Sequence, residues 1–160
     1  MAAASAYQTI VVGYDGTRSA ELALARAALI AGRAGSKLVV VDVVPPMPVD
    51  GVDGAYGLMP YSYPSIETTQ ATEEAIWKQH REKAEAFLSA GGVDYEFAGV
   101  VGQPAGELVD VAAQRQAGLI VVGTREPGFF ERMFGGSVSQ GVAKHARCDV
   151  LIVHPPDDAG

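Results

Sequence analysis

The order of apolar and polar positions divides the chain into alternating strands and helices. Short runs rich in Val, Ile and Leu, bounded by Gly, Pro or Asp, are typical of strands. Longer segments with apolar residues on one helical face are typical of helices. Strands are predicted over 9–16, 36–44, 93–102, 119–123 and 149–154. Helices are predicted over 17–35, 67–90, 104–116 and 137–146.

Two of these helices carry a clear apolar stripe. The stripe comprises Leu24, Ala27, Ala28 and Ala31 in the first helix, and Trp77, Ala84 and Leu88 in the second. Gly32 and Gly35 are expected to stop the first helix, because glycine is a poor helix former and a common C-terminal cap. Pro104 suits the first turn of the third helix.

The alternation of strands and helices, without a hairpin signal, predicts an α/β fold with right-handed crossovers and an open parallel sheet. The run 36–44 is almost wholly apolar, so this strand is expected to be buried on both faces. At 160 residues, the chain is read as a single domain, 1–160, with a tail at 155–160. The Pro-, Gly- and Tyr-rich stretch 45–66 is a long loop, of the kind that forms a lid, a binding segment or a disordered region.

Ligands of open parallel sheets bind beyond the carboxyl ends of the strands. The predicted strands place Asp15, Val43, Gly102 and Gly123 along that rim. This edge of the sheet is therefore where a site is expected.

Composition and charge narrow the function classes. The chain is 48% hydrophobic and 19% charged, with a net charge of -7 and a pI near 4.8, which disfavours nucleic acid and anionic membranes as partners. Its apolar runs are far shorter than the ~20 residues of a membrane span, and the start lacks a basic signal-peptide region. Cys148 is the single cysteine, which suits a reducing compartment, so a cytoplasmic location is expected.

The loop 123–137, "GTREPGFFERMFGGS", follows the fourth strand and has glycines at both ends. Such a loop can turn its N–H groups toward phosphate, and the helix after it offers an N-terminus and a Ser hydroxyl. By itself the pattern is neither a Walker A loop nor a dinucleotide fingerprint. A flexible strand-to-helix connection explains it equally well.

The position and spacing of this loop resemble the universal stress protein family, whose nucleotide-binding members carry Gly-x2-Gly-x9-Gly-Ser/Thr after the fourth strand. Gly123 occupies the first position, and Gly136 with Ser137 the last pair, at the same total spacing. The resemblance extends over nearly the whole chain. It includes "IVVGYDGTRSAELAL", "VVGQPAGELVDVA", "LIVVGTR" and "GGSVSQGVAKHARCDVLIVH".

The resemblance implies a five-stranded sheet in the order 3-2-1-4-5 with helices on both faces, as in adenine nucleotide alpha hydrolase-like folds. It implies ATP as ligand, or AMP or cyclic AMP, and a homodimer of the kind often formed through the last strand, 149–154. In this reading Asp15 accepts from the ribose hydroxyls and the backbone of Val43 reads adenine. The nucleotide-binding residues carried over are Gly13, Tyr14, Asp15, Val43, Gly123, Thr124, Arg125, Gly136, Ser137, Val138 and Ser139.

Glu126 departs from the pattern, because it stands where the second glycine of the signature belongs. A side chain in a left-handed conformation costs about 1–2 kcal/mol. A carboxylate near a phosphate adds repulsion of about 3 kcal/mol at ~5 Å and an effective dielectric of ~20. Two arrangements would avoid these costs: Glu126 points outward with Gly128 taking the bend, or Mg²⁺ lies between the carboxylate and the phosphates.

Other chemistries find little support in the sequence. A phosphorelay would need further acids beside Asp15 and a Lys after the last strand. His80, His145 and His154 have no metal-ligand spacing, and there is no serine-nucleophile elbow. No catalytic residue and no metal site are predicted, although slow ATP hydrolysis with a water oriented by Glu126 stays open.

The sequence leaves two functions open. The first is a universal stress protein that binds an adenine nucleotide and acts as a regulatory module in the stress response. The second is a protein-interaction module of the same fold, with unknown protein partners, in which Glu126 has abolished nucleotide binding.

Overall fold

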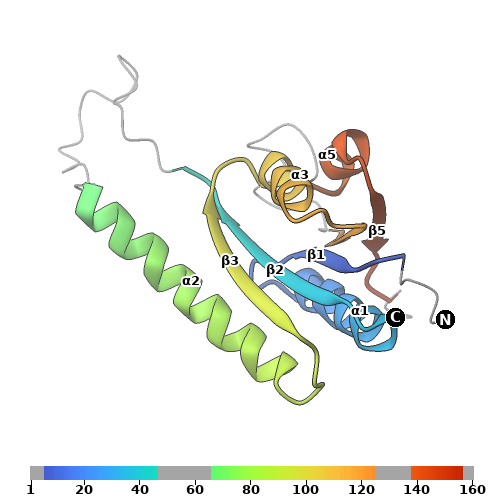
Figure 1. Ribbon diagram of the computed structural model, residues 1–160. Coiled ribbons are helices and arrows are strands. Elements are labelled where there is room, and N and C mark those ends of the chain that lie inside the picture. Colours follow the sequence, from blue (N-terminus) through green and yellow to red (C-terminus); the bar gives the residue numbers. More distant parts are fainter. Residues whose placement is uncertain (1–5, 47–65, 125–137, 157–160) are drawn as a thin grey trace.

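The computed structural model describes residues 6–46, 66–124 and 138–156. Within them a five-stranded parallel sheet has the order β3-β2-β1-β4-β5, which confirms the predicted topology (Figure 1). Its strands are β1 (Thr9–Gly13), β2 (Lys37–Val44), β3 (Tyr95–Val101), β4 (Leu119–Gly123) and β5 (Asp149–Val153). The helices are α1 (Arg18–Ala34), α2 (Ile66–Leu88), α3 (Pro104–Gln114) and α5 (Val138–His145).

The central strands are buried on both faces, as their almost wholly apolar runs predict. Val11 of β1 lies between Val39 of β2 and Ile120 of β4 in parallel register. All three side chains are at most 1% exposed. Parallel strands joined by helical crossovers are normally covered on both sides, and this sheet follows the rule.

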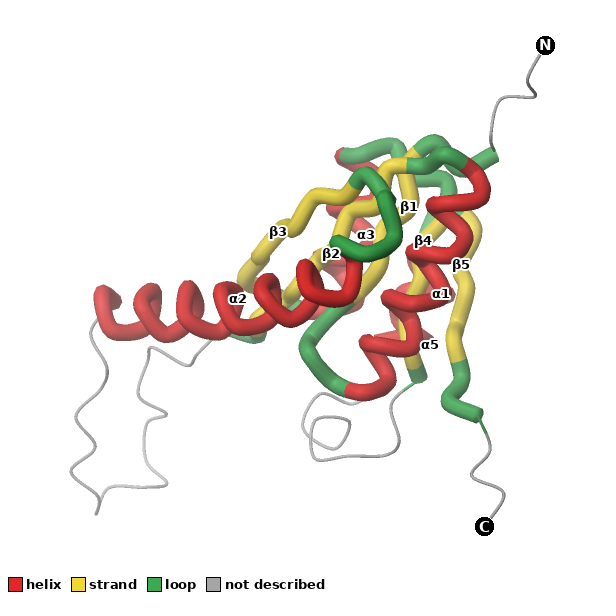
Figure 2. Tube along the Cα trace, turned by 90° about the horizontal axis from the view of Figure 1, so that it is seen from below, coloured by secondary structure: helices red, strands yellow, loops and turns green. Residues whose placement is uncertain are grey.

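Helices cover the two faces of the sheet in pairs. Ile10 and Val12 belong to the core cluster under α1 and α2, whereas Val11 belongs to the cluster under α3 and α5. Figures 1 and 2 show α1 and α2 on one side of the sheet, with α2 running along β2 and β3. Alternate residues of one strand therefore point to different helix pairs, as the two-residue repeat of a strand requires.

Helix α1 begins and ends at residues that cap it. The Thr17 side chain accepts a hydrogen bond from the Ala20 amide, and Gly35 ends the helix in a left-handed conformation with φ of 67°. The expected stop at Gly32 is wrong, because the helix continues through it. A glycine inside a helix costs only about 1 kcal/mol relative to alanine, and a Cβ at Gly32 would meet no atom closer than 3.7 Å.

The remaining boundaries differ from the predictions by a few residues. Pro104 is the first residue of α3, as predicted, but α3 ends at Gln114 because Gln116 has a positive φ of 52°. Helix α2 ends at Leu88, before a turn that includes the left-handed Gly92. Within the described residues, no helix is long and apolar enough to cross a membrane.

Ion pairs tie the amino ends of two strands to the end of α3. Lys37 of β2 lies 3.0 Å from the carboxylate of Glu96 on β3, and Arg115 binds the same carboxylate through both terminal nitrogens. Lys37 and Arg115 together lower the pKa of Glu96, with the Lys37 hydrogen bond the largest cause.

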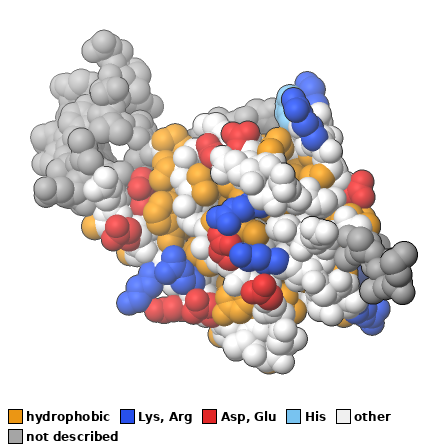
Figure 3. All heavy atoms as spheres, in the orientation of Figure 1, with side chains coloured by type: hydrophobic (Ala, Val, Ile, Leu, Met, Phe, Trp, Pro, Cys, Tyr) orange, Lys and Arg blue, Asp and Glu red, His pale blue; other side chains and the backbone are white. Residues whose placement is uncertain are grey.

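On the face shown in Figure 3, acidic and basic side chains are interspersed, so no single sign of charge dominates that face.

Candidate functional site

A pocket lies where the carboxyl ends of β1, β2 and β4 meet the starts of α1, α3 and α5. Its empty volume is about 580 Å³, with the open solvent at its mouth included. The lining residues are Gly13, Tyr14, Asp15, Thr17, Ser19, Ala20, Val41, Val43, Pro104, Leu108, Val122, Gly123, Val138 and Ser139.

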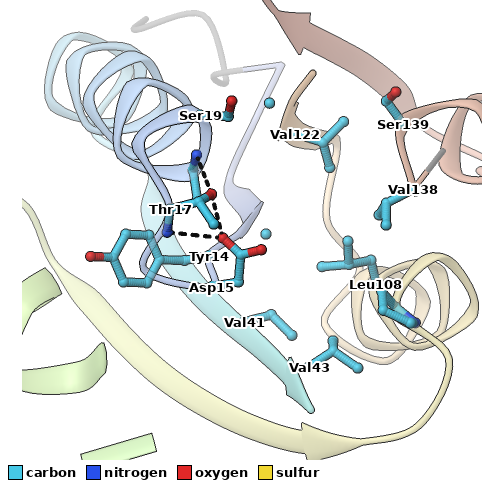
Figure 4. Close-up of a pocket in the computed structure, with 14 residues that line it drawn as sticks. Tyr14, Asp15, Thr17, Ser19, Val41, Val43, Leu108, Val122, Val138 and Ser139 are labelled. Atoms are coloured by element: carbon cyan, nitrogen blue, oxygen red, sulfur yellow. Dashed lines mark hydrogen bonds between the residues drawn. The ribbon is translucent and has the colours of Figure 1, made fainter. Parts of the chain in front are cut away.

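The turn from β1 to α1 carries Asp15, whose carboxylate lies at the pocket. Oδ1 of Asp15 accepts hydrogen bonds from the amide of Thr17 at 3.1 Å and from its hydroxyl at 2.6 Å. Gly16 between them has a φ of +75°, a conformation that glycine adopts without strain. Figure 4 shows these bonds on the α1 side of the pocket, so the turn fixes how the Asp15 carboxylate is oriented there. Thr17, not Asp15, is the N-cap of α1.

The opposite wall of the pocket is apolar. Leu108 of α3 lies so close to Gly13 that a Cβ there would be 3.1 Å from its Cδ1 atom. Val43 and Val138 continue the apolar lining on either side of Leu108 in Figure 4. A wall of aliphatic side chains facing a carboxylate suits a ligand with one flat apolar part and one part rich in hydroxyl groups.

The end of β4 approaches the first turn of α1 very closely. A Cβ at Gly123 would lie 2.5 Å from the carbonyl oxygen of Ser19, so only glycine fits here without a backbone shift. Thr124 then continues the ladder, with its amide donating to the carbonyl of Val153 at 2.9 Å. Ser139, in the first turn of α5, is 7% exposed. The chain therefore leaves β4 and enters α5 beside the same pocket.

Tyr14 lines the pocket, but its ring packs in the core cluster under α1 and α2. Its amide donates to the carbonyl of Val41 at 2.8 Å, while its ring points away from the pocket toward α2 (Figure 4). The ring is 3% exposed and meets the ring of His80 edge-on, with centroids 6.3 Å apart. Burial, followed by the nearby carboxylates of Glu21 and Asp42, raises the pKa of the Tyr14 hydroxyl.

A buried pair, Asp42 and His80, lies behind the pocket on the α2 side. Nδ1 of His80 is 2.6 Å from Oδ2 of Asp42, and the carboxylate is only 1% exposed. Burial raises the pKa of Asp42 above its ordinary value, and the hydrogen bond and charge of His80 offset only part of this rise. The sequence shows His80 only as a histidine without metal-ligand spacing inside the predicted helix 67–90, so this pair was not predicted. A lone acid inside "LVVVDVV" was the available signal, because a buried carboxylate needs a partner.

The predicted site residues gather at one place wherever the structure describes them. Gly13, Tyr14, Asp15, Val43, Gly123, Val138 and Ser139 line the pocket, and Thr124 follows Gly123 directly. Gly102 lies on the rim but does not line the pocket; its amide bonds the Val44 carbonyl. Arg125, Glu126, Gly128, Gly136 and Ser137 lie outside the described residues.

Several lining residues were not predicted. Thr17 and Ser19 belong to "DGTRSAE", where two hydroxyls at a helix start were a readable signal for a polar wall. Pro104 and Leu108 come from α3, and nothing in the local pattern says that α3 faces this rim. In the described part of the chain, no group of three or more His, Cys, Asp or Glu residues is arranged to hold a metal ion.

Comparisons with known proteins agree with this fold. A sequence model of the universal stress protein family matches residues 6–154. The chain is 37% identical over 150 residues to universal stress protein Rv1636 of Mycobacterium tuberculosis, covering 94% of this chain and 98% of that protein.

Solved structures give the same result. A universal stress protein in complex with cAMP is 34% identical, with a TM-score of 0.65 over 94% of this chain and 98% of that one. Universal stress protein UspA from Lactobacillus plantarum is 26% identical, with a TM-score of 0.71 over 92% of this chain and 97% of that one. By sequence and by fold, the chain belongs to the universal stress protein family.

Proposed function

We propose that this universal stress protein binds an adenine nucleotide in the pocket at the carboxyl ends of β1, β2 and β4, and acts as a regulatory module in the stress response. One observation carries the proposal. The pocket brings together residues from distant parts of the chain, Asp15, Val43, Gly123 and Ser139, to which the family resemblance gives nucleotide-binding roles.

Each part of the nucleotide has a partner of suitable chemistry in this proposal. Adenine packs against Leu108 and Val138 and is read by the main chain of Val43. The ribose hydroxyls donate to Asp15, a charged acceptor that its own turn holds in place. The phosphates lie toward Gly123 and the start of α5, where N–H groups favour anions.

ATP is the first ligand to test, and AMP and cyclic AMP are the alternatives. The relative solved with cAMP supports an adenine nucleotide at this level of identity. Mg²⁺ would accompany ATP on its phosphates, since Mg²⁺ commonly binds one or two carboxylates together with substrate phosphates. Mass spectrometry of the small molecule released when the purified chain is denatured would identify a co-purified nucleotide.

Glu126 decides between the two functions left open by the sequence. If its carboxylate repels the phosphates, Glu126→Gly should tighten ATP binding at least tenfold, because ~1.4 kcal/mol corresponds to tenfold in affinity. Titration calorimetry of both chains with ATP, with and without Mg²⁺, measures this. Glu126→Gln, which keeps the size but loses the charge, is the matched control that separates repulsion from backbone strain.

The ATP titrations of the native chain and of Glu126→Gly distinguish the two functions. Binding of ATP by the native chain supports a nucleotide-dependent module. Binding that appears only in Glu126→Gly contradicts that proposal and favours the alternative, a protein-interaction module of this fold that has lost its nucleotide. The specific observation behind the alternative is the acid at the second glycine position of the signature.

We also propose a homodimer formed through β5. This strand is an edge of the sheet within the described residues, and Leu151 and Ile152 on its two faces are only partly buried. An exposed strand edge tends to pair with another chain. Light scattering on the purified protein should give twice the monomer mass of 16.7 kDa, and Ile152→Lys should shift it toward the monomer. A native mass of one chain would contradict the dimer.

A further inference from the structure

Two residues of helix α2, His80 and Lys83, contact the turn that carries Asp15. Neither of them is among the residues that line the pocket. Nζ of Lys83 donates a hydrogen bond to the carbonyl of Gly16 at 3.0 Å. The same ammonium forms an ion pair with Glu21 in the first turn of α1. Lys83 therefore joins α2 to the connection between β1 and α1 and to the first turn of α1.

His80, one turn before Lys83, packs on the same turn. A Cβ at Gly16 would lie 2.9 Å from both Cδ2 and Nε2 of the imidazole. The ring also meets Tyr14 edge-on, at an interplanar angle of 82°. The imidazole thus occupies the space next to Gly16 and contacts the residue on either side of Asp15.

The imidazole is itself held in place from the sheet. Its Nδ1 bonds the Asp42 carboxylate of β2, which is 1% exposed, and the His80 side chain is 21% exposed. When Asp42 is ionised its carboxylate can only accept, and Nδ1–H of His80 is then the donor. A ring bonded to a buried group cannot leave the turn without breaking a charged hydrogen bond.

We propose that His80 and Lys83 are positioning residues for the adenine-nucleotide site. They hold the turn of Asp15, Gly16 and Thr17 in the conformation that presents the Asp15 carboxylate to the pocket. The inference rests on the proposed function for its ligand, but the support of the turn by α2 is a property of the chain alone. It also couples the site to α2, so that nucleotide binding and the packing of α2 stabilise each other.

Lys83→Met tests the proposal, because it keeps the aliphatic stem and removes the ammonium. We expect the Kd for cAMP, measured by calorimetry, to rise about three- to tenfold, the effect of losing the hydrogen bond to Gly16 together with a solvent-exposed ion pair to Glu21. Lys78→Met is the matched control. It makes the same change on the same helix, at a side chain that is 77% exposed and pairs only with Glu82 among the described interactions. Its Kd should stay within twofold of the native value.

His80→Asn provides a second variant, since its amide can still donate to Asp42 while the ring beside Gly16 is lost. Its Kd for cAMP should rise at least as much as that of Lys83→Met. Urea unfolding of every variant checks that the fold is intact. Native binding by Lys83→Met and His80→Asn together would overturn the proposal.

A ligand-free measurement separates this inference from the proposed function. The Thr17 amide, bonded to Asp15, should exchange its hydrogen faster in Lys83→Met than in Lys78→Met. When cAMP binds, the amides of 80–83 should in turn become more protected, because coupling is reciprocal. If the native chain binds neither cAMP nor ATP, the proposed function fails, and the Thr17 exchange still decides whether α2 supports the turn. Equal Thr17 exchange in both variants would overturn it.

Discussion

Asp15→Ala is expected to weaken binding of ATP and cAMP about 10- to 150-fold. A hydrogen bond to a charged group contributes about 1.5–3 kcal/mol, and each ~1.4 kcal/mol is tenfold in affinity. The loss should be large here because the carboxylate is oriented in advance by Thr17, so the ligand does not have to order it. Titration calorimetry at constant salt measures the change.

Two further variants make the result specific. Asp15→Asn keeps an oxygen for the Thr17 amide but loses the charge, so its Kd should fall between those of the native chain and Asp15→Ala. Asp94→Ala removes an exposed acid just before β3, at the far end of the sheet, and should bind normally. Unchanged affinity in Asp15→Ala would show that the nucleotide lies elsewhere on the protein.

His80→Ala is expected to destabilise the fold by about 3 kcal/mol, the lower end of the range for removing one partner of a buried ionisable pair. The lower end applies because His80 is 21% exposed, whereas the Asp42 carboxylate it leaves behind is 1% exposed. A carboxylate without a partner in the apolar interior must either stay charged at high cost or take up a proton. Urea unfolding followed by circular dichroism gives the difference.

The double variant Asp42→Val with His80→Leu should recover most of this loss. Replacing both members of a buried pair by apolar side chains of similar size is often neutral or stabilising. Gln79→Ala, at the exposed neighbour of His80, is the control for disturbing α2 itself. If the double variant is as unstable as His80→Ala, the loss comes from helix packing and not from the unpaired carboxylate.

Much of the fold could be predicted from local patterns, because β1, β2 and β4 are buried on both faces and carry almost no polar residue to blur the signal. Sheet order came from the family resemblance rather than from the pattern. Gly32 and Gly35 have the same propensity to end a helix, yet α1 continues through Gly32 and ends at Gly35. Propensity ranks both glycines alike, and only their surroundings distinguish them.

The site was predictable where its residues lie at strand ends, and less so where contacts are long-range. Asp15, Val43 and Gly123 come together because parallel strands end at one rim. Leu108 and the pair of Asp42 with His80 depend on how α3 and α2 are seated. His80 is 38 residues from Asp42, and the spacing along the chain carries no sign of their contact.

Trp77, the single tryptophan of the chain, gives the molecule a built-in optical probe. It lies on α2 one turn before His80, with its indole packed on the backbone of Gly99 in β3, so closely that a Cβ there would be 2.5 Å from the ring. Its Nε1 is buried and, among the described residues, has no hydrogen-bond partner. Indole emission depends on the polarity around the ring, so any shift of α2 off the sheet would change the colour and intensity of the fluorescence without a label.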